Sequence, residues 1–283
     1  MLPARFELHR PESLAEVFDL IETHGDDATV LAGGTELLIT LKTRVLRYDH
    51  VIDLKRVPGL SEVVLKDGFL SIGALATHHQ LANHPLVLEH FPVYARLSEH
   101  VANIRVRVAG TLGGNLCFAE SHADPPAMLC ALGARLRLAS KDGERYLPME
   151  DFIIDEFMTE RGDDELLLAV EIPLLPTGAR AAYHGFGHLE RPAASVAAVA
   201  LPAAKGWEWR FWVGAACGRP TRMEALEQAV NGLDAEAALA QVAEQVAAVV
   251  EQLDVHDDIH GGEDYKRHLI TVMAQRAAKE CMQ

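Results

Sequence analysis

The stretch GTLGGNL, residues 110–116, holds three glycines, a threonine and an asparagine in seven positions. A tight turn needs one glycine, which reaches backbone conformations closed to other residues. Three glycines therefore indicate a backbone that comes very close to another group. We interpret this stretch as a donor-rich turn at a binding site.

A second glycine segment, LAGGTEL at residues 31–37, lies between a predicted short strand and a helical-looking stretch. Glycine lets backbone N–H groups face a phosphate without a Cβ in the way, and a helix start adds favourable partial charge. The Thr35 hydroxyl adds another donor. The segment matches neither G-x-G-x-x-G nor the P-loop pattern, so on its own a plain tight turn is the more common explanation. Two such segments together can clasp a diphosphate, because paired backbone N–H nests hold its two negative charges without a lysine.

The composition is that of a folded, acidic protein. The length of 283 residues fits one large or two ordinary domains, and 49% hydrophobic with 24% charged residues argues against disorder. The net charge of -15 argues against unspecific binding of nucleic acid or anionic membranes. The N-terminal sequence resembles no secretion signal and no stretch approaches 18 apolar residues, so we expect no membrane insertion and a cytoplasmic location.

The cysteines and histidines suggest no metal ligand set. The cysteines lie far apart without a C-x-x-C pair, which fits reduced thiols; they are Cys117, Cys130, Cys217 and Cys281. Two histidine-rich stretches, HHQLANH at 78–84 and HDDIH at 256–260, raise the question of a metal, but the second has no third ligand nearby. We expect surface or helix-capping histidines in both, and we place any redox metal in a partner.

Hydrophobic periodicity and turn signals predict the order of the elements. The chain opens as strand, helix and strand, and Ser13 and Glu16 form an S-x-x-E capping box for a helix that ends at Gly25. Two Asp-Gly hairpins follow, LSEVVL-KDG-FLSIGA and LRLAS-KDGE-RYLPM, and ELLLAVEIPL is a last strand. Helices are expected at residues 77–82, 86–100 and 126–132.

A stretch of proline, glycine and small residues, LLPTGARAA, predicts a domain boundary near Pro176. Residues 1–176 then form one domain, with subdomains at about 1–55 and 56–176, and residues 177–283 form another. In this C-terminal domain we expect strands at 181–186, 195–203 and 207–215, and helices at 223–230, 235–253 (capped by Asp234) and 264–279.

Four stretches in order carry a family resemblance: LAGGTELLITLK, IGALATHHQL, RVAGTLGGNLCFAESHADPPAMLCALGARLRL and HLERPAASVAAVAL. Together they resemble the FAD-binding medium subunit of molybdenum hydroxylases, the group of xanthine, carbon monoxide and aldehyde dehydrogenases. The similarity runs through nearly the whole chain. It implies an α+β fold, in which a two-subdomain FAD-binding domain of the vanillyl-alcohol oxidase type precedes a small antiparallel sheet with helices, as in the C-terminal domain of carbon monoxide dehydrogenase flavoproteins.

The resemblance also implies the residues that hold the cofactor. The FAD diphosphate would lie between the two glycine segments, and GTLGGNL would be glycine-rich because the diphosphate lies against its backbone. Carried over by position, the cofactor-binding residues are Leu31, Ala32, Gly33, Gly34, Thr35, Glu36, Ala102, Thr111, Gly113, Gly114, Asn115 and Asp124. No residue is expected to act as a catalytic acid or base, since the usual nucleophile and metalloprotease motifs are missing.

The same resemblance implies partner subunits. A large molybdopterin subunit would hydroxylate the substrate with water-derived oxygen, and a small subunit with two [2Fe-2S] clusters would pass electrons to FAD. The expected assembly is a dimer of heterotrimers. The substrate and the final acceptor, whether NAD, a quinone or oxygen, stay open.

Three positions depart from the family pattern. Val108 stands where an asparagine is common, Ser121 where a proline is common, and Gly185 near a common lysine. Two alternatives therefore stay open. One is a flavin-free scaffold subunit; the other is a self-contained flavin oxidoreductase of the same fold, for which the sequence offers no clear acid or base.

Overall fold

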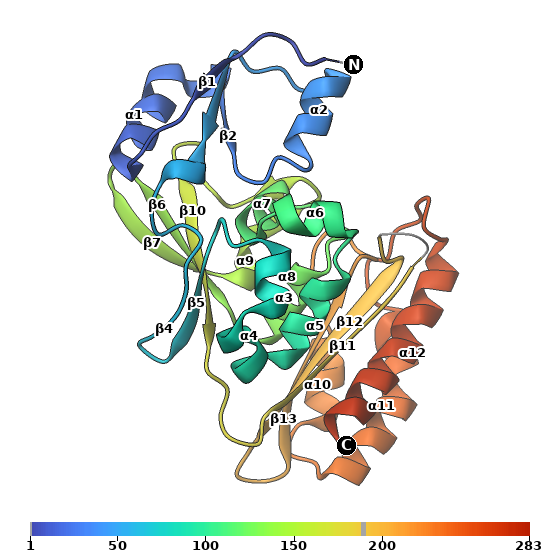
Figure 1. Ribbon diagram of the computed structural model, residues 1–283. Helices are drawn as coiled ribbons and strands as arrows, with labels where there is room; N and C mark the ends of the chain where they lie inside the picture. Colours follow the sequence, from blue (N-terminus) through green and yellow to red (C-terminus); the bar gives the residue numbers. More distant parts are fainter. Residues whose placement is uncertain (1, 188–190) are drawn as a thin grey trace.

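Three sheets form the framework of the molecule, which this computed structural model describes at residues 2–187 and 191–283. A small parallel sheet comes first along the chain, a five-stranded antiparallel sheet second, and a four-stranded antiparallel sheet last. Helices lie between the second and third sheets, and further helices cover the other face of the third (Figure 1). The architecture is therefore α+β.

The N-terminal unit is a parallel sheet with two helices. Its elements are β1 (Glu7–His9), α1 (Leu14–His24), β2 (Ala28–Leu31), α2 (Leu37–Thr43) and β3 (His50–Asp53), with strand order β1-β3-β2. The Ser13 hydroxyl accepts a hydrogen bond from the backbone N–H of Glu16 at 3.3 Å, and Gly25 ends α1, so the predicted N-cap is confirmed. The Glu16 half of the predicted capping box differs, because its carboxylate accepts from the Glu12 N–H at 2.8 Å. Val17 of α1 packs with Ile52 of β3 in a buried cluster, which places α1 on one face of this sheet.

The second sheet is built from two hairpins and one later strand. Its strands are β4 (Val63–Lys66), β5 (Phe69–Gly73), β6 (Arg135–Ser140), β7 (Gly143–Pro148) and β10 (Leu166–Pro173), in the order β4-β5-β10-β6-β7. The first hairpin turns at Asp67 and Gly68, whose φ angles of +51° and +81° are typical of a type I′ turn. Both hairpins predicted from Asp-Gly pairs are present.

Short helices connect the first hairpin to β6. They are α3 (His78–Asn83), α4 (Pro85–His90), α5 (Pro92–His100), α6 (Ile104–Ala109), α7 (Leu112–Phe118) and α8 (Pro125–Ala131). The predicted single helix over 86–100 is wrong, because α4 ends before Phe91 and α5 begins at Pro92. Proline has no N–H and disfavours the helical conformation in the residue before it, and Phe91 accordingly has φ -138° and ψ 59°.

A short helix and a two-stranded ribbon precede β10: α9 (Met149–Phe152), β8 (Ile153–Asp155) and β9 (Met158–Thr159). The C-terminal part then contains β11 (Arg180–Phe186), β12 (Ala194–Pro202), β13 (Trp207–Gly214), β14 (Thr221–Arg222), α10 (Glu224–Val230), α11 (Ala235–Val250) and α12 (Glu263–Cys281). The predicted strands and helices are all present here, and the Asp234 carboxylate caps α11 by accepting from the Ala237 N–H at 2.9 Å.

The third sheet is buried on both faces. Trp209 and Phe211 stack at 5.3 Å on the face covered by α10 to α12, whereas Trp212 points to the other face. That face belongs to the same buried cluster as α5, α8 and the second sheet, so the two parts of the chain share a core. The boundary near Pro176 stays a prediction. In the described parts of the chain, no helix has both the length and the apolar character needed to cross a membrane.

Candidate functional site

Two glycine-rich segments lie against each other where the N-terminal unit meets the short helices. We call residues 32–36, the loop between β2 and α2, the first segment. Residues 110–115, which follow α6 and include the first turn of α7, are the second segment. A Cβ on Gly33 would lie 2.2 Å from the last carbonyl oxygen of α6. Gly114 faces Ala32, because a Cβ on Gly114 would lie 3.7 Å from the Ala32 Cβ. The fold thus brings the two segments together.

The first segment has free backbone donors. Within residues 2–187 and 191–283, the N–H groups of Gly33, Gly34, Thr35 and Glu36 donate to no protein acceptor. Gly34 has a φ angle of +76°, which a residue with a side chain rarely adopts. Successive N–H groups in such a loop form a concave donor site for an anion. This part of the predicted site has the donors that a diphosphate requires.

The second segment begins a helix and is not a free turn. Thr111 is the N-cap of α7, and its hydroxyl accepts from the Gly114 N–H at 3.1 Å. The N–H groups of Leu112 and Gly113 donate to carbonyl oxygens just after β5, at 2.9 and 2.8 Å. The first amide donors of α7 are therefore used inside the chain. The prediction of a donor-rich turn is corrected for this segment, because tertiary contacts satisfy its donors.

Glycine is required at the positions of the second segment for different reasons. A Cβ on Gly113 would lie 2.6 Å from the Cβ of Ala74 and 2.8 Å from its carbonyl oxygen, so only glycine lets α7 pack this closely on the second sheet. A Cβ on Gly110 would lie 2.9 Å from the Val106 carbonyl oxygen. Packing inside the chain thus accounts for these two glycines, whereas the expectation from sequence assigned them to the ligand. Gly114 faces the first segment, and a Cβ there would also lie 2.9 Å from the Thr111 hydroxyl oxygen.

Unpaired polar atoms lie beside these segments. The Asn115 side-chain oxygen is buried and has no hydrogen-bond partner in the described part of the chain. The Thr111 hydroxyl accepts one hydrogen bond and still has its own hydrogen to donate. Behind the second segment, burial and the smaller effect of the Arg107 charge lower the pKa of His78 to about 4, so this imidazole is neutral at pH 7. Within the described residues the Asn115 oxygen lacks a donor, so a donor group of a ligand can pair with it.

Asp124 has a partner that the sequence did not reveal. It precedes α8, and the Tyr183 hydroxyl of β11 donates to its carboxylate at 2.6 Å. Burial raises the pKa of Asp124 to about 6 even though the Tyr183 hydrogen bond lowers it. Ionisation of this carboxyl group costs free energy, and no cation among the described residues contacts it directly. Such a perturbed carboxyl group is typical of functional positions.

Ala102 lies on a separate turn between α5 and α6. Its φ angle of +42° is unusual for a residue with a side chain. Arg107 holds this turn by donating to the carbonyl oxygens of Val101 and Ala102, at 3.0 and 2.9 Å. The turn is therefore fixed by α6, the helix that leads into the second segment.

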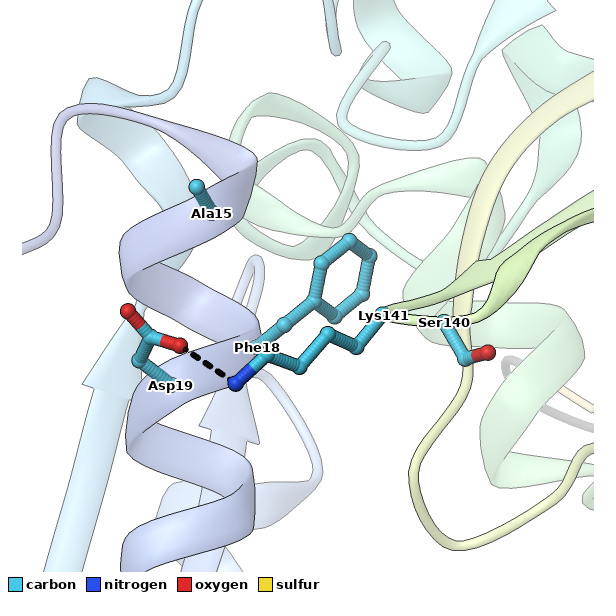
Figure 2. A pocket seen from close by; sticks show the side chains of 5 residues that line it. All are labelled: Ala15, Phe18, Asp19, Ser140 and Lys141. Atoms are coloured by element: carbon cyan, nitrogen blue, oxygen red, sulfur yellow. Dashed lines mark hydrogen bonds and ion pairs between the residues drawn. The ribbon is translucent and has the colours of Figure 1, made fainter.

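A surface cavity of about 260 Å³ lies elsewhere, between α1 and the β6–β7 turn. Figure 2 shows Lys141 reaching from this turn to Asp19 on α1, where the ion pair measures 3.0 Å. The remaining lining residues are Ala15, Phe18 and Ser140. None of the residues expected to bind FAD lines this cavity, so it is not the predicted site.

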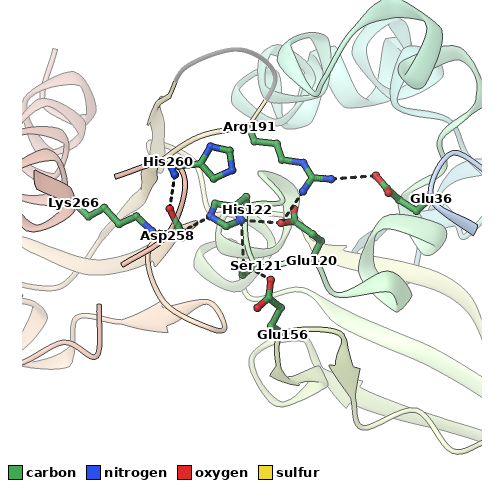
Figure 3. Close-up of polar contacts among 9 residues, drawn as sticks. All are labelled: Glu36, Glu120, Ser121, His122, Glu156, Arg191, Asp258, His260 and Lys266. Atoms are coloured by element: carbon green, nitrogen blue, oxygen red, sulfur yellow. Dashed lines mark hydrogen bonds and ion pairs between the residues drawn. The ribbon is translucent and has the colours of Figure 1, made fainter. Parts of the chain in front are cut away.

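A chain of charged side chains connects the first segment to the C-terminal part (Figure 3). Arg191 lies between Glu36 and Glu120, with nitrogen–oxygen distances of 3.6 and 3.2 Å. His122 then lies between Glu120 and Asp258, at 2.8 Å from each carboxylate. Sequence analysis missed this network, although Arg191 and His122 stand in stretches that carry the family resemblance. No local spacing connects residues so far apart in the chain.

The network favours the protonated form of His122. Burial alone would lower the pKa of His122, but its hydrogen bonds to Glu120 and Asp258 outweigh burial and raise it. Burial would likewise raise the pKa of Glu120, yet the His122 hydrogen bond and the Arg191 charge lower it. Lys266 pairs with Asp258 from α12. Alternating charges therefore hold the segment after α7 against the C-terminal part.

The three departures from the family pattern occupy tolerant positions. Val108 is 52% exposed on α6. The Ser121 hydroxyl donates to a carboxylate oxygen of Glu156 at 3.2 Å. A Cβ on Gly185 would lie 3.6 Å from the Asp124 carboxylate, an ordinary contact, so a side chain fits there. None of the three closes the space between the segments.

Comparison with known proteins gives the same assignment for the whole chain. Residues 4–175 match the family described as FAD binding domain in molybdopterin dehydrogenase. The chain is 30% identical to the nicotine 6-hydroxylase medium subunit of Paenarthrobacter nicotinovorans over 276 residues, covering 95% of each chain. It is also 30% identical to the glyceraldehyde dehydrogenase medium chain of Sulfolobus acidocaldarius over 283 residues, covering 99% of each.

A solved structure has the same fold. Carbon monoxide dehydrogenase from Hydrogenophaga pseudoflava superposes with a TM-score of 0.92 and 28% identity, covering 100% of this chain and 99% of that chain. The α+β fold class and the family resemblance found in the sequence are thereby confirmed. The residue assignments within the site stay predictions.

Proposed function

Because the chain belongs to the family of FAD-binding domains in molybdopterin dehydrogenases, we propose that it transfers electrons through FAD as the medium subunit of a molybdenum hydroxylase complex. The observation that carries this proposal is the run of free backbone donors in the first segment, beside the unpaired oxygen of Asn115. When bound, FAD accepts and releases the electrons, and the protein supplies binding, orientation and electrostatics.

The first segment would hold the diphosphate. Its free N–H groups, from Gly33 to Glu36, donate to phosphate oxygens, and no lysine is needed. The Thr111 hydroxyl donates its remaining hydrogen, and the Asn115 oxygen accepts from an N–H or O–H of the cofactor. Leu31 ends β2, and Ala32 begins this loop. The residues present therefore fit a cofactor that carries a diphosphate.

The other expected residues contribute less directly. Gly114 keeps the face toward the first segment free of a side chain, while Gly113 holds α7 in place. Asp124, with Tyr183 as its partner, offers a carboxyl group to the hydroxyl groups of the cofactor. Ala102 shapes the turn that Arg107 fixes.

The partners follow from the family. We propose a large molybdopterin subunit and a small [2Fe-2S] subunit, assembled as a dimer of heterotrimers in the cytoplasm. The small subunit delivers electrons to FAD in this chain, and an external acceptor removes them. Relatives described as a medium subunit or a medium chain support the assembly, since those names imply further subunits.

A flavin-free scaffold role has no structural support. The scaffold hypothesis rested on the departures at Val108 and Gly185. The Val108 side chain is exposed, and a Cβ fits at Gly185, so neither departure argues against flavin binding. Among the described residues, four backbone donors and a buried amide oxygen have no partner, and a flavin-free scaffold gives no reason for leaving them unpaired.

A visible absorbance spectrum of the purified chain, alone and in its co-purified complex, tests the proposal. We expect a flavin band after FAD addition, and we expect the cofactor released by denaturation to be FAD. Gly114→Asp, which turns a carboxylate toward the first segment, should lose the band because it repels the diphosphate. Ala243→Asp adds the same charge on the exposed side of α11 and should retain it. A complex that holds its partner subunits but never binds flavin would instead support the scaffold role.

A further inference from the structure

Three histidines from separate parts of the sequence meet in the N-terminal unit. His9 ends β1, His24 ends α1, and His50 begins β3. One ring nitrogen from each lies within 4.8 Å of the other two. All three residues are partly buried, so water reaches the cluster but does not surround it.

The fold explains why these side chains converge. β1 and β3 are parallel neighbours in which Glu7 pairs with His50 and His9 pairs with Ile52. Side chains two residues apart point to the same face of a strand, so His9, His50 and Ile52 share one face. Val17 of α1 and Ile52 belong to the same buried cluster, which places α1 over this face. The last residue of α1, His24, therefore reaches the two strand histidines.

The distances suit a shared ion. His9 Nε2 lies 3.0 Å from His50 Nδ1, and the His24 and His50 rings stack with their centroids 3.7 Å apart. A tetrahedral zinc ion with bonds of about 2.0–2.1 Å to nitrogen keeps its ligand atoms roughly 3.3 Å apart. One nitrogen from each ring lies within 4.8 Å of the other two, so one ion can reach all three when the rings reorient. An ion would replace the hydrogen bond that His9 and His50 now share.

The chemistry of the cluster also suits an ion. Metal ligands must be neutral imidazoles with a free lone pair. A carboxylate oxygen of Glu7 lies 3.7 Å from His50 Nδ1 and is available as a fourth ligand or as a hydrogen-bond partner. Imidazole ligands favour zinc, copper, nickel and cobalt over magnesium and calcium.

We propose that His9, His24 and His50 bind one divalent transition-metal ion of the zinc class. The ion would join β1, α1 and β3 and so stabilise the N-terminal unit. It would lie away from the first segment, because His50 pairs with Ala28 at the start of β2, whereas that segment follows the end of β2. The site is therefore independent of the flavin site and does not rest on the proposed electron-transfer function.

Titration of the full, untagged chain with Co²⁺ and Zn²⁺ tests the proposal. We expect one ion per chain, a visible Co²⁺ absorption typical of tetrahedral nitrogen ligation, and its displacement by Zn²⁺. His9→Asn, His24→Asn and His50→Asn should each weaken Zn²⁺ binding by at least about 10- to 100-fold, the loss that outer-shell changes already cause. His268→Asn removes an exposed histidine of α12 and should leave the affinity unchanged.

Thermal unfolding provides a second readout. Zn²⁺ should raise the unfolding midpoint of the wild-type chain and of His268→Asn, and should raise it less in the three cluster variants, since only a ligand bound to the folded state stabilises it. Mg²⁺ should have no effect. The proposal is overturned if Zn²⁺ binds only above about 1 mM or if the cluster variants bind it as tightly as His268→Asn does. FAD content should be equal in all four variants, which separates this test from the flavin proposal.

Discussion

Residues 32–36 and 110–115 are both rich in glycine and lie against each other, but their backbone donors have opposite fates. In the first segment, the N–H groups from Gly33 to Glu36 have no acceptor within the described residues. In the second segment, the first N–H groups of α7 are bound by Thr111 and by carbonyl oxygens after β5. One segment is open to a ligand, and the other is a packed helix start.

The difference teaches that glycine content alone does not identify a phosphate site. Gly113 is required because α7 packs directly on Ala74, with or without a ligand. Gly34 is required because of its positive φ angle. The informative observation is which donors remain unpaired, and only the folded structure shows that. Substitutions in the two segments should therefore separate folding from flavin binding.

The largest expected effect is on folding, at Gly113. Gly113→Ala places a Cβ 2.6 Å from the Ala74 Cβ and 2.8 Å from its backbone oxygen, so α7 must shift. We expect the free energy of unfolding, measured in urea without FAD, to fall by about 3 kcal/mol. Gly68→Ala, in the exposed β4–β5 turn where no atom lies within 4 Å, measures the cost of a strained φ angle alone. A change no larger than that of Gly68→Ala would show that close packing does not explain Gly113.

The second effect is on flavin affinity, at Gly114. Gly114→Asp and Gly114→Asn add side chains of nearly equal size to the face opposite Ala32. The carboxylate repels a diphosphate, so we expect the Asp variant to bind FAD about 100-fold more weakly than the Asn variant, a difference of about 2.7 kcal/mol. Fluorescence titration with FAD measures both. Equal affinities would place the diphosphate elsewhere.

The third effect is at Asp124, where one substitution should increase stability and weaken FAD binding. Burial raises the folded-state pKa of Asp124 from 3.8 to about 6, so ionisation costs the folded protein free energy. This contribution to stability is fully present below about pH 4 and is lost as the pH rises through about 6. Asp124→Asn should therefore raise the free energy of unfolding of the FAD-free chain by about 2 kcal/mol at about pH 7.5. A pKa shift of two units corresponds to roughly 3 kcal/mol, and the expected effect is smaller because Asp124 is partly exposed.

Urea unfolding at several pH values measures this difference, which should shrink toward zero near pH 4. The same variant should bind FAD about tenfold more weakly, because it loses a carboxyl partner of the cofactor, a cost of about 1.4 kcal/mol. Tyr183→Phe is the matched control, since it removes the hydrogen bond to Asp124 and keeps the carboxyl group. A constant difference across the pH range would contradict the raised pKa.

The smallest effect is at Thr111, which serves both folding and binding. Thr111→Val keeps the shape but removes the hydroxyl that caps α7, and we expect a loss of about 1 kcal/mol in unfolding free energy. Thr111→Ser retains the hydroxyl and should lose less. FAD affinity should fall with the valine and not with the serine. If both variants bind FAD equally, the hydroxyl acts only as a helix cap.

Much of the fold was predictable where the signal is local. The Ser13 cap of α1, the Asp67-Gly68 turn and the Asp234 cap of α11 each depend on residues within a few positions. The sequence-based predictions failed where tertiary contacts determine the local structure. The sequence did not predict α7, because two glycines stand in its first turn and glycine has poor helix propensity. Hydrogen bonds to carbonyl oxygens just after β5 stabilise the start of this helix instead.

The same distinction between local signals and tertiary contacts applies to the candidate site. Family motifs led to the two segments, but they could not show which donors stay free. The Arg191 and His122 network and the histidine cluster join residues from distant parts of the chain, without any spacing that marks them. His9, His24 and His50 come from two strands and one helix end, so only the packing of α1 on the parallel sheet reveals them.

Amide hydrogen exchange, with and without FAD, tests the central claim most directly. The measurement should use the reconstituted chain and be repeated in the assembled complex. Our account predicts that FAD slows exchange strongly at residues 33–36, whose donors are free, and changes it little at residues 112–114, whose donors are already bonded. Equal protection of both segments, or none at residues 33–36, would contradict the assignment of the first segment as the diphosphate site.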